Sequence, residues 1–165
     1  PANQVIGTGT SLDTARLQLM IGKKLCINPK NVQAYVIGEH GDSEFIPWSN
    51  ANISLQNIKE FFSKEEMDKI EYDVRNAAYE IINRKGATYY GIGMALVRIT
   101  NAILGNENAI IALSVYDEVN DVYIGMPAIL NKDGVERRIR LNLTEEESRK
   151  LQNSIDIIKD NINNL

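Results

Sequence analysis

The sequence contains one histidine, His40, within the pentapeptide Gly38-Glu39-His40-Gly41-Asp42. Histidine is the side chain whose unperturbed pKa, about 6.5, allows proton exchange near neutral pH. The two neighbouring glycines would let a substrate approach the imidazole ring closely. The same pentapeptide also fits a surface turn in which the glycines serve only the backbone. Acid-base catalysis and a structural turn are therefore both open interpretations of this segment.

Asp13 and Arg16 are three residues apart in a segment with helical periodicity, so their side chains would project from one helix face. A carboxylate bonded to one imidazole nitrogen orients the ring and stabilises its protonated form. A guanidinium group binds a carboxylate through two parallel hydrogen bonds. With His40, the pair could recognise and deprotonate a small 2-hydroxy acid. An intrahelical ion pair worth a few tenths of a kcal/mol explains the same spacing.

Periodicity and turn residues predict the elements that would position these three side chains. Apolar residues at helical spacing predict helices over residues 11–25, 64–84 and 89–104, the first with Thr10 and Ser11 as candidate caps. A short apolar run predicts a strand over residues 32–37. His40 would then lie on a tight loop just past a strand.

The pattern changes to β structure after Asn108, with turn-rich segments between the apolar runs. We expect an antiparallel meander of strands over residues 109–116, 122–126, 129–130 and 135–141. Thr144 and Glu147 have the spacing of a capping box, and apolar steps of four and three predict a terminal amphipathic helix as far as Leu165. No linker or repeat interrupts the chain. The predicted fold is a single α+β domain, in which helices pack on one antiparallel sheet.

Composition excludes several classes of function. The 165 residues carry 18 basic and 22 acidic side chains, a net charge of -4, and no long basic run, so nucleic-acid binding has no electrostatic support. The single cysteine, Cys26, cannot form an internal disulfide, which fits a reducing compartment and a cytoplasmic protein. No apolar stretch approaches the roughly 20 residues that span a bilayer, so we expect no membrane segment. One histidine and one cysteine make a metal site the weakest interpretation.

Three strings of the sequence resemble a known family. They are VIGTGTSLDTAR (Val5–Arg16), NVQAYVIGEHGDSEFIPW (Asn31–Trp48) and KGATYYGIGMALVRIT (Lys85–Thr100). Each is similar to the corresponding signature in the catalytic domain of the L-lactate dehydrogenases, and the similarity extends from Pro1 through the terminal helix. The resemblance implies the fold of the lactate/malate dehydrogenase C-terminal domain.

The resemblance also implies roles for individual residues. His40 would be the acid/base, Asp13 its partner and Arg16 the anchor for the carboxylate of lactate or pyruvate. Thr88 would border the substrate, and Ile92 would pack against the nicotinamide ring of NAD. The family forms dimers and tetramers, so the resemblance further implies a homo-oligomer.

The sequence lacks a complete glycine-rich fingerprint for binding a dinucleotide. Gly7 with Gly9 and Gly91 with Gly93 each start the spacing, but leucines occupy the third-glycine positions. We therefore expect the chain to begin within a larger fold, as a substrate-binding and catalytic domain, and an NAD-binding domain to precede Pro1 in the parent enzyme. That domain would also hold the mobile-loop arginine and the residue that distinguishes lactate from malate.

Two other interpretations stay open. The same chemistry could act on malate or 2-hydroxyisocaproate, although Glu39 and the string Ala87-Thr88-Tyr89-Tyr90 look more like the lactate enzymes. Alternatively, the isolated chain could be only a folding and assembly module, in which the terminal helix and the region of Trp48 form subunit contacts.

Two glutamines depart from a pattern within the family. Many bacterial members that fructose 1,6-bisphosphate activates carry an arginine two positions after the carboxylate-binding arginine and a histidine seven positions before the catalytic one. Here these positions hold Gln18 and Gln33. Because neutral amides replace two possible phosphate-binding cations, we expect the parent enzyme to be insensitive to this effector.

Overall fold

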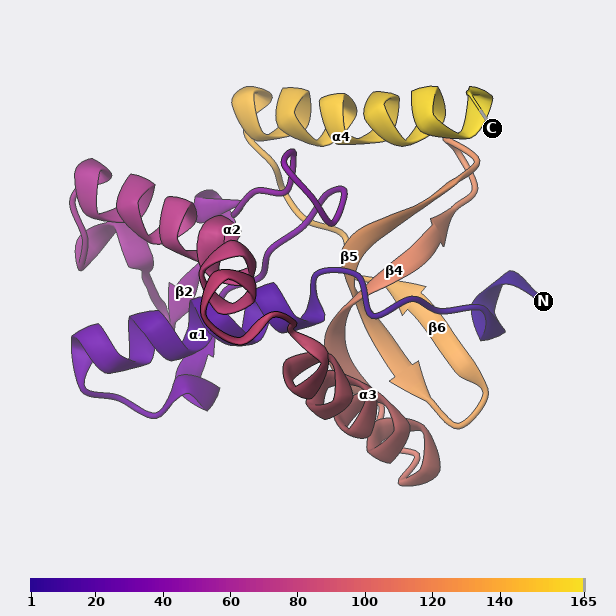
Figure 1. The fold of residues 1–165 in the computed structure, drawn as a ribbon, viewed down its shortest axis with the longest axis horizontal. Coiled ribbons are helices and arrows are strands. Elements are labelled where there is room, and N and C mark those ends of the chain that lie inside the picture. The colour runs from indigo at the N-terminus through magenta and orange to yellow at the C-terminus, as the bar shows by residue number, and fades with distance from the viewer. Residues whose placement is uncertain (165) are drawn as a thin grey trace.

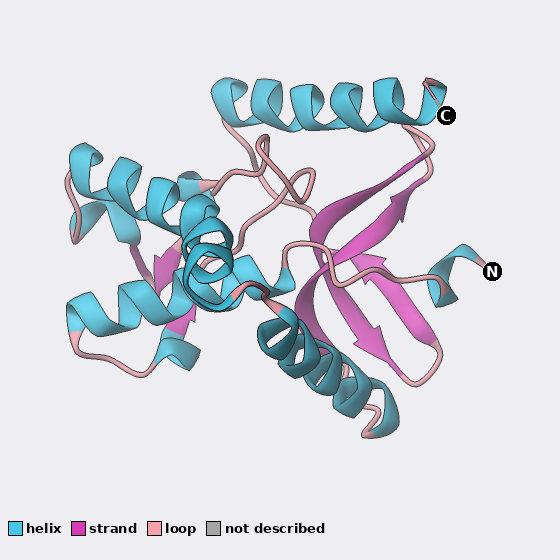
Figure 2. Cartoon of the chain, viewed as in Figure 1, coloured by secondary structure: helices cyan, strands magenta, loops and turns pink. Residues whose placement is uncertain are grey.

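The computed structural model describes residues 1–164, which form helices around two antiparallel sheets (Figures 1 and 2). Leu165, the predicted end of the terminal helix, lies outside the described residues. Within residues 1–164, no helix is both long and apolar enough to cross a membrane. In chain order the elements are the 3-10 helix η1 (Ala2–Gln4), α1 (Ser11–Leu25), η2 (Pro29–Asn31), β1 (Val32–Gln33), η3 (Trp48–Asn50), β2 (Asn52–Ile53), β3 (Gln56–Asn57), η4 (Ile58–Glu60), α2 (Lys64–Lys85), α3 (Tyr89–Leu104), β4 (Ala109–Asp117), β5 (Val122–Asn131), β6 (Gly134–Arg138) and α4 (Glu145–Asn163).

The four long helices confirm the helical predictions. The bounds of α1 and α3 agree with the sequence, and α2 ends one residue later than expected, where Gly86 adopts a positive φ of 81°. The predicted capping box of α4 is present: Thr144 Oγ1 accepts a hydrogen bond from Glu147 N at 3.2 Å, and a Glu147 carboxylate oxygen accepts one from Thr144 N at 2.9 Å.

The predicted meander is the sheet β4-β5-β6, shown in magenta in Figure 2. The sequence pattern predicts a break in its central strand around Pro127, whereas β5 runs through this residue. Gly125 uses its N–H and C=O to pair with Gly38, away from β4, and Pro127 faces the same way two residues later. The missing N–H of Pro127 therefore costs no bond to β4, and its carbonyl accepts one from Ile139 N at 2.8 Å. The prediction for the last strand was too long, because β6 ends at Arg138.

The prediction of a strand over residues 32–37 was largely wrong. Only Val32–Gln33 form a strand, which pairs with β2 in a small second sheet that the sequence pattern does not indicate. Beyond it, side chains of α1 replace a partner strand: Thr14 Oγ1 accepts a hydrogen bond from Val36 N at 3.0 Å, and Thr10 Oγ1 donates one to Val36 O at 2.6 Å. Because Thr10 is used in this way and Ser11 Oγ donates to Ala112 O, neither hydroxyl caps α1 as expected.

Residues 36–46 separate two hydrophobic cores. Val36 and Ile46 pack into a core with α1 and α2, whereas Ile37 and Phe45 pack into a core with the β4-β5-β6 sheet, α3 and α4. Adjacent side chains of an extended segment point to opposite sides, so one short stretch contributes to both cores. Figure 1 shows α1 and α2 on one side, the sheet on the other, and α4 across one end. The loop between Ile37 and Phe45 lies where the two cores meet.

Candidate active site

The loop that carries His40 is closed and anchored by backbone hydrogen bonds. Ile37 and Phe45 bond each other in both directions at 2.9 and 3.0 Å, and Gly38 pairs with Gly125 of β5 through two bonds of 2.9 Å. A side chain at Gly125 would bring its Cβ to 2.7 Å from the Gly38 carbonyl oxygen, and Gly38 itself has a φ of 101°. The two glycines therefore let the loop lie directly against the sheet.

The imidazole of His40 faces two buried carboxylates. Its Nδ1 lies 3.0 Å from Asp13 Oδ2 and 3.4 Å from Glu44 Oε2. The ring N–H is aligned for a hydrogen bond with Glu44, whereas Asp13 Oδ2 makes a charged contact with Nδ1 without a linear hydrogen bond. The His40 side chain is 59% exposed, so the ring is held at Nδ1 and still reaches solvent. Its Nε2 has no hydrogen-bond partner among residues 1–164 and is open to a ligand.

The carboxylates strongly favour the protonated ring. The contact with Asp13 and then that with Glu44 raise the pKa of His40 to about 10, against the opposing effect of partial burial. Burial is the main cause that raises the pKa of Glu44, and its hydrogen bond with His40 opposes that rise. At neutral pH the ring is therefore an imidazolium, which can donate a proton from Nε2.

Asp13 bridges the other two predicted residues. Its Oδ1 accepts a hydrogen bond from Arg16 Nη1 at 2.8 Å, while its Oδ2 lies against His40. The intrahelical ion pair and the carboxylate–histidine contact, which the sequence left as alternatives, occur together. Asp13, His40 and Glu44 place possible metal-ligating atoms within 4.8 Å of one another. Because the guanidinium and the imidazolium already balance the two carboxylates, the cluster is better suited to holding a proton than a metal ion.

Arg16 and Thr88 line one pocket of about 430 Å³, between α1, the end of α2 and the start of α3. Three cations and one acidic side chain line it, which suits a small anion. The N-terminus of α3 also meets this pocket, and its positive end favours negative charge. Thr88 is the N-cap residue of α3, but its side chain accepts no hydrogen bond from the first turn of the helix. The lining residues are Leu12, Arg16, Glu80, Ile81, Arg84, Lys85, Ala87, Thr88, Tyr90 and Gly91.

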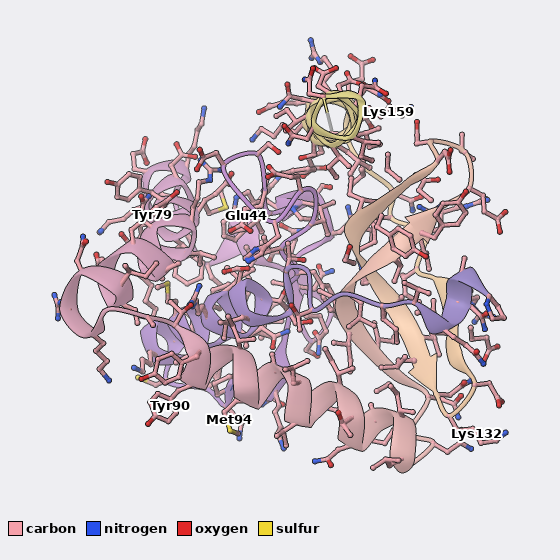
Figure 3. All side chains as sticks on the ribbon, turned by 45° about the vertical axis from the view of Figure 1, so that its right-hand side comes forward. Glu44, Tyr79, Tyr90, Met94, Lys132 and Lys159 are labelled. Atoms are coloured by element: carbon pink, nitrogen blue, oxygen red, sulfur yellow. The ribbon has the colours of Figure 1, made fainter. Side chains whose placement is uncertain are left out.

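Ile92 lies outside this arrangement. It is one turn beyond Thr88, is 43% exposed and does not line the pocket that Arg16 and Thr88 share. Figure 3 shows its neighbours Tyr90 and Met94 along α3 at the edge of the molecule, and both side chains are largely exposed. The structure thus brings His40, Asp13 and Arg16 together and leaves Ile92 on an apolar surface that these residues do not cover.

Glu44 is a site residue that sequence reasoning missed. It lies four residues after His40, and the pattern of residues 38–42 indicates a turn without indicating where the loop returns. A short loop that closes on itself can bring residues four apart together, and this signal could have identified it. Of the two glutamines singled out, Gln18 donates to Ala34 O at 3.2 Å and Gln33 is exposed on β1.

The sequence of the chain is similar to one known protein family and to several of its members. Residues 10–165 match the model of the family described as lactate/malate dehydrogenase, alpha/beta C-terminal domain. The chain is 47% identical over 170 residues to "L-lactate dehydrogenase 2" of Bacillus cereus, covering 97% of this chain and 54% of that protein. It is 49% identical over 166 residues to "L-lactate dehydrogenase 1" of Listeria monocytogenes serovar 1/2a, covering 96% and 53%.

Two solved structures share the fold over the whole chain. A lactate dehydrogenase from a Medee basin deep-sea metagenome library has a TM-score of 0.95 at 50% identity, covering 99% of this chain and 55% of that one. The minor L-lactate dehydrogenase from Enterococcus mundtii has a TM-score of 0.96 at 39% identity, covering 100% and 56%. These matches confirm the expected fold class. The chain spans about half the length of the relatives it matches.

Proposed function

Because this chain belongs to the lactate/malate dehydrogenase family, we propose that it is the substrate-binding, catalytic domain of an NAD-dependent L-lactate dehydrogenase. The observation that carries the proposal is the bridge made by Asp13, which contacts a histidine through one oxygen and an arginine through the other. A 2-hydroxy acid needs these two functions side by side, a proton acceptor for its hydroxyl and a cation for its carboxylate. The names of the relatives favour lactate among such acids.

Each residue then has a distinct task in the reaction. Arg16 pairs with the substrate carboxylate in the pocket that it shares with Thr88, and Thr88 borders the bound molecule. In lactate oxidation, neutral His40 accepts the hydroxyl proton at Nε2. In pyruvate reduction, the imidazolium donates that proton to the carbonyl oxygen as it becomes the hydroxyl. Asp13 holds the ring at Nδ1 and stabilises its charged form.

NAD would accept or supply the hydride, which is chemistry that no amino-acid side chain provides. Among the residues described here, we assign only Ile92 to the nicotinamide, against one face of the ring, because it is apolar, exposed and one turn from Thr88. We therefore place the NAD-binding domain in a part of the enzyme outside this chain, in agreement with the 54% of the relative's length that the chain covers. The chemistry would act on malate or 2-hydroxyisocaproate in the same way, so substrate choice depends on residues beyond this chain.

We also propose a cytoplasmic homo-oligomer, a dimer or tetramer. The exposed apolar side chains of α3, which include Tyr90, Met94 and Leu96, provide surface for contacts with another domain or subunit. The single cysteine fits a reducing compartment.

Turnover tests the proposal directly. The chain joined to its NAD-binding domain should reduce pyruvate with NADH, and the separate 165-residue chain should show only background activity. His40→Gln in the joined protein is the matched control, because it removes the proton donor without removing any backbone hydrogen bond that closes the loop. Robust turnover by the purified separate chain would contradict the proposal that NAD binds to a domain outside this chain. Failure of the joined, folded protein on pyruvate with activity on another 2-oxo acid would correct the substrate.

A further inference from the structure

Glu44 occupies a position next to His40 that the roles described above leave unexplained. It is 4% exposed, and its Oε2 lies 3.4 Å from His40 Nδ1, on which Asp13 also converges. Figure 3 shows Glu44 in the middle of the molecule. Within residues 1–164, His40 is the only group that hydrogen-bonds its carboxylate. A buried carboxylate loses its hydration, so a glutamate at this position is costly unless the imidazolium stabilises it.

The backbone fixes Glu44 in this place. The paired residues Ile37 and Phe45 close the loop immediately after Glu44, and Arg75 of α2 donates from Nη2 to the Glu44 carbonyl oxygen at 2.9 Å. Arg75 is itself held by Glu71 one turn earlier, at 3.2 Å. The backbone of Glu44 is thus held by the loop closure and by Arg75 of α2, and in this position its carboxylate faces the imidazole.

Charged groups from three helices face Glu44. Asp13 of α1 raises its pKa, while His40 and Arg75 lower it, and burial has the largest effect. On the α4 side, two cations and one acidic residue line a pocket of about 510 Å³ beside Glu44, together with the Glu71–Arg75 pair. The α4 residues are Glu146, Arg149 and Lys150.

We propose that Glu44 is a positioning residue: it accepts the hydrogen bond from His40 Nδ1 beside the charged contact with Asp13, and so helps to keep the ring protonated for pyruvate reduction. The proposal rests on the lactate dehydrogenase function proposed above. Two acceptors near Nδ1 restrict rotation of the ring more than one does, and both stabilise the imidazolium. Glu44 therefore favours the direction of reaction that starts from the protonated ring.

NMR titration of the 165-residue chain tests this without any activity measurement, since His40 is its only histidine. The His40 pKa should fall in Glu44→Gln and fall further in Asp13→Asn, whose contact is shorter. It should stay unchanged in Asp42→Asn, which removes an exposed carboxylate of the same loop. Glu44→Asp, which keeps the charge but withdraws it by one methylene, should give an intermediate pKa and serves if Glu44→Gln does not fold.

The unmodified chain provides a second measurement. Above the His40 pKa, the ring 15N shifts should show the remaining proton on Nδ1, where both carboxylates can accept it. A proton on Nε2, or an unchanged pKa in either folded Glu44 variant, would overturn the proposal.

Kinetics of the joined enzyme separates this proposal from the function on which it rests. In Glu44→Gln the alkaline limb of pyruvate reduction should move to lower pH, and each displacement of one pH unit lowers kcat/KM about tenfold on that limb. If Glu44→Gln is active and the alkaline limb of its pH profile does not move, the role of Glu44 is refuted and the proposed lactate dehydrogenase function is not. A lowered His40 pKa in a joined enzyme without lactate dehydrogenase activity would refute the function and leave the contact intact.

Discussion

The two halves of the candidate site differ in how much of their surroundings this chain supplies. Around His40, two carboxylates are buried, and a guanidinium and backbone bonds hold the cluster in place. Around Thr88 and Ile92, the pocket is open and the neighbouring face of α3 is apolar and exposed. Proton transfer depends on partners fixed before the substrate arrives, whereas a surface that receives a cofactor must stay uncovered until it binds. Under the proposed function, the contrast fits a chain that supplies the acid-base residues and leaves the hydride chemistry to a bound cofactor.

Arg16 belongs to both halves, so changing it gives the sharpest test of the contrast. Arg16→Lys in the joined enzyme should lower kcat/KM for pyruvate by roughly 10- to 150-fold, the equivalent of about 1.5 to 3 kcal/mol for a charge-assisted bond. The KM for NADH should change little, because Arg16 contacts Asp13 and shares its pocket with Thr88, whereas Ile92, the residue proposed to meet the cofactor, does not line that pocket. Equal losses for both ligands in steady-state assays would assign Arg16 a structural role.

The half of the site around His40 should also make the stability of the chain depend on pH. The folded pKa of His40, about 10, is raised above its ordinary value near 6.5 by the carboxylates. The stabilisation is therefore complete below about pH 6.5 and is lost as pH rises through about 10. The difference in free energy of unfolding between the unmodified chain and His40→Gln, from urea denaturation, should be largest just below about pH 6.5, decline as the pH rises, and vanish above about pH 10. A difference that does not vary with pH would contradict the ion-paired cluster.

In the separate chain, substitutions in the half of the site around Thr88 and Ile92 should have little effect on stability. Ile92→Ala should change the free energy of unfolding by less than about 0.5 kcal/mol, because the side chain is 43% exposed. In the joined enzyme it should raise the KM for NADH and leave that for pyruvate nearly unchanged. Ile99→Ala, on the same helix but 8% exposed, is the matched control and should cost about 2 to 5 kcal/mol. A comparable loss for Ile92→Ala would show that this face is already covered within the chain.

Local signals were sufficient for the helices and the meander. Capping residues such as Thr144 and the glycine after α2 act within a few residues, so a single sequence records them. The same holds for Asp13 and Arg16, whose separation along one helix places them together. The roles of Thr88 and Ile92 came from family resemblance and remain proposals, since neither spacing nor burial identifies a substrate or cofactor contact.

Contacts between distant segments account for what was missed. The strand expected over residues 32–37 stops early because the hydroxyls of Thr10 and Thr14, more than 20 residues away, take the place of a neighbouring strand. The break expected between residues 126 and 129 is absent, because Gly38 lies opposite Gly125 and Pro127 faces the same way, where its missing N–H costs no bond to β4. Glu44 escaped notice because its environment is set by loop closure and by Arg75. None of these partners can be inferred from local periodicity.

The placement of Val36 and Ile37 in different cores has a consequence for cooperativity. A loop attached to the edge of one core can open by local fluctuation, at a fraction of the free energy of global unfolding. Here both ends of the His40 loop lie in the segment on which the two cores meet, so freeing the loop disrupts both cores. We expect the amides of Ile37 and Phe45 to be among the slowest in the chain to exchange with solvent. His40, the proposed proton-transfer residue, is then held by the part of the molecule that opens last, and its geometry persists for as long as the domain is folded.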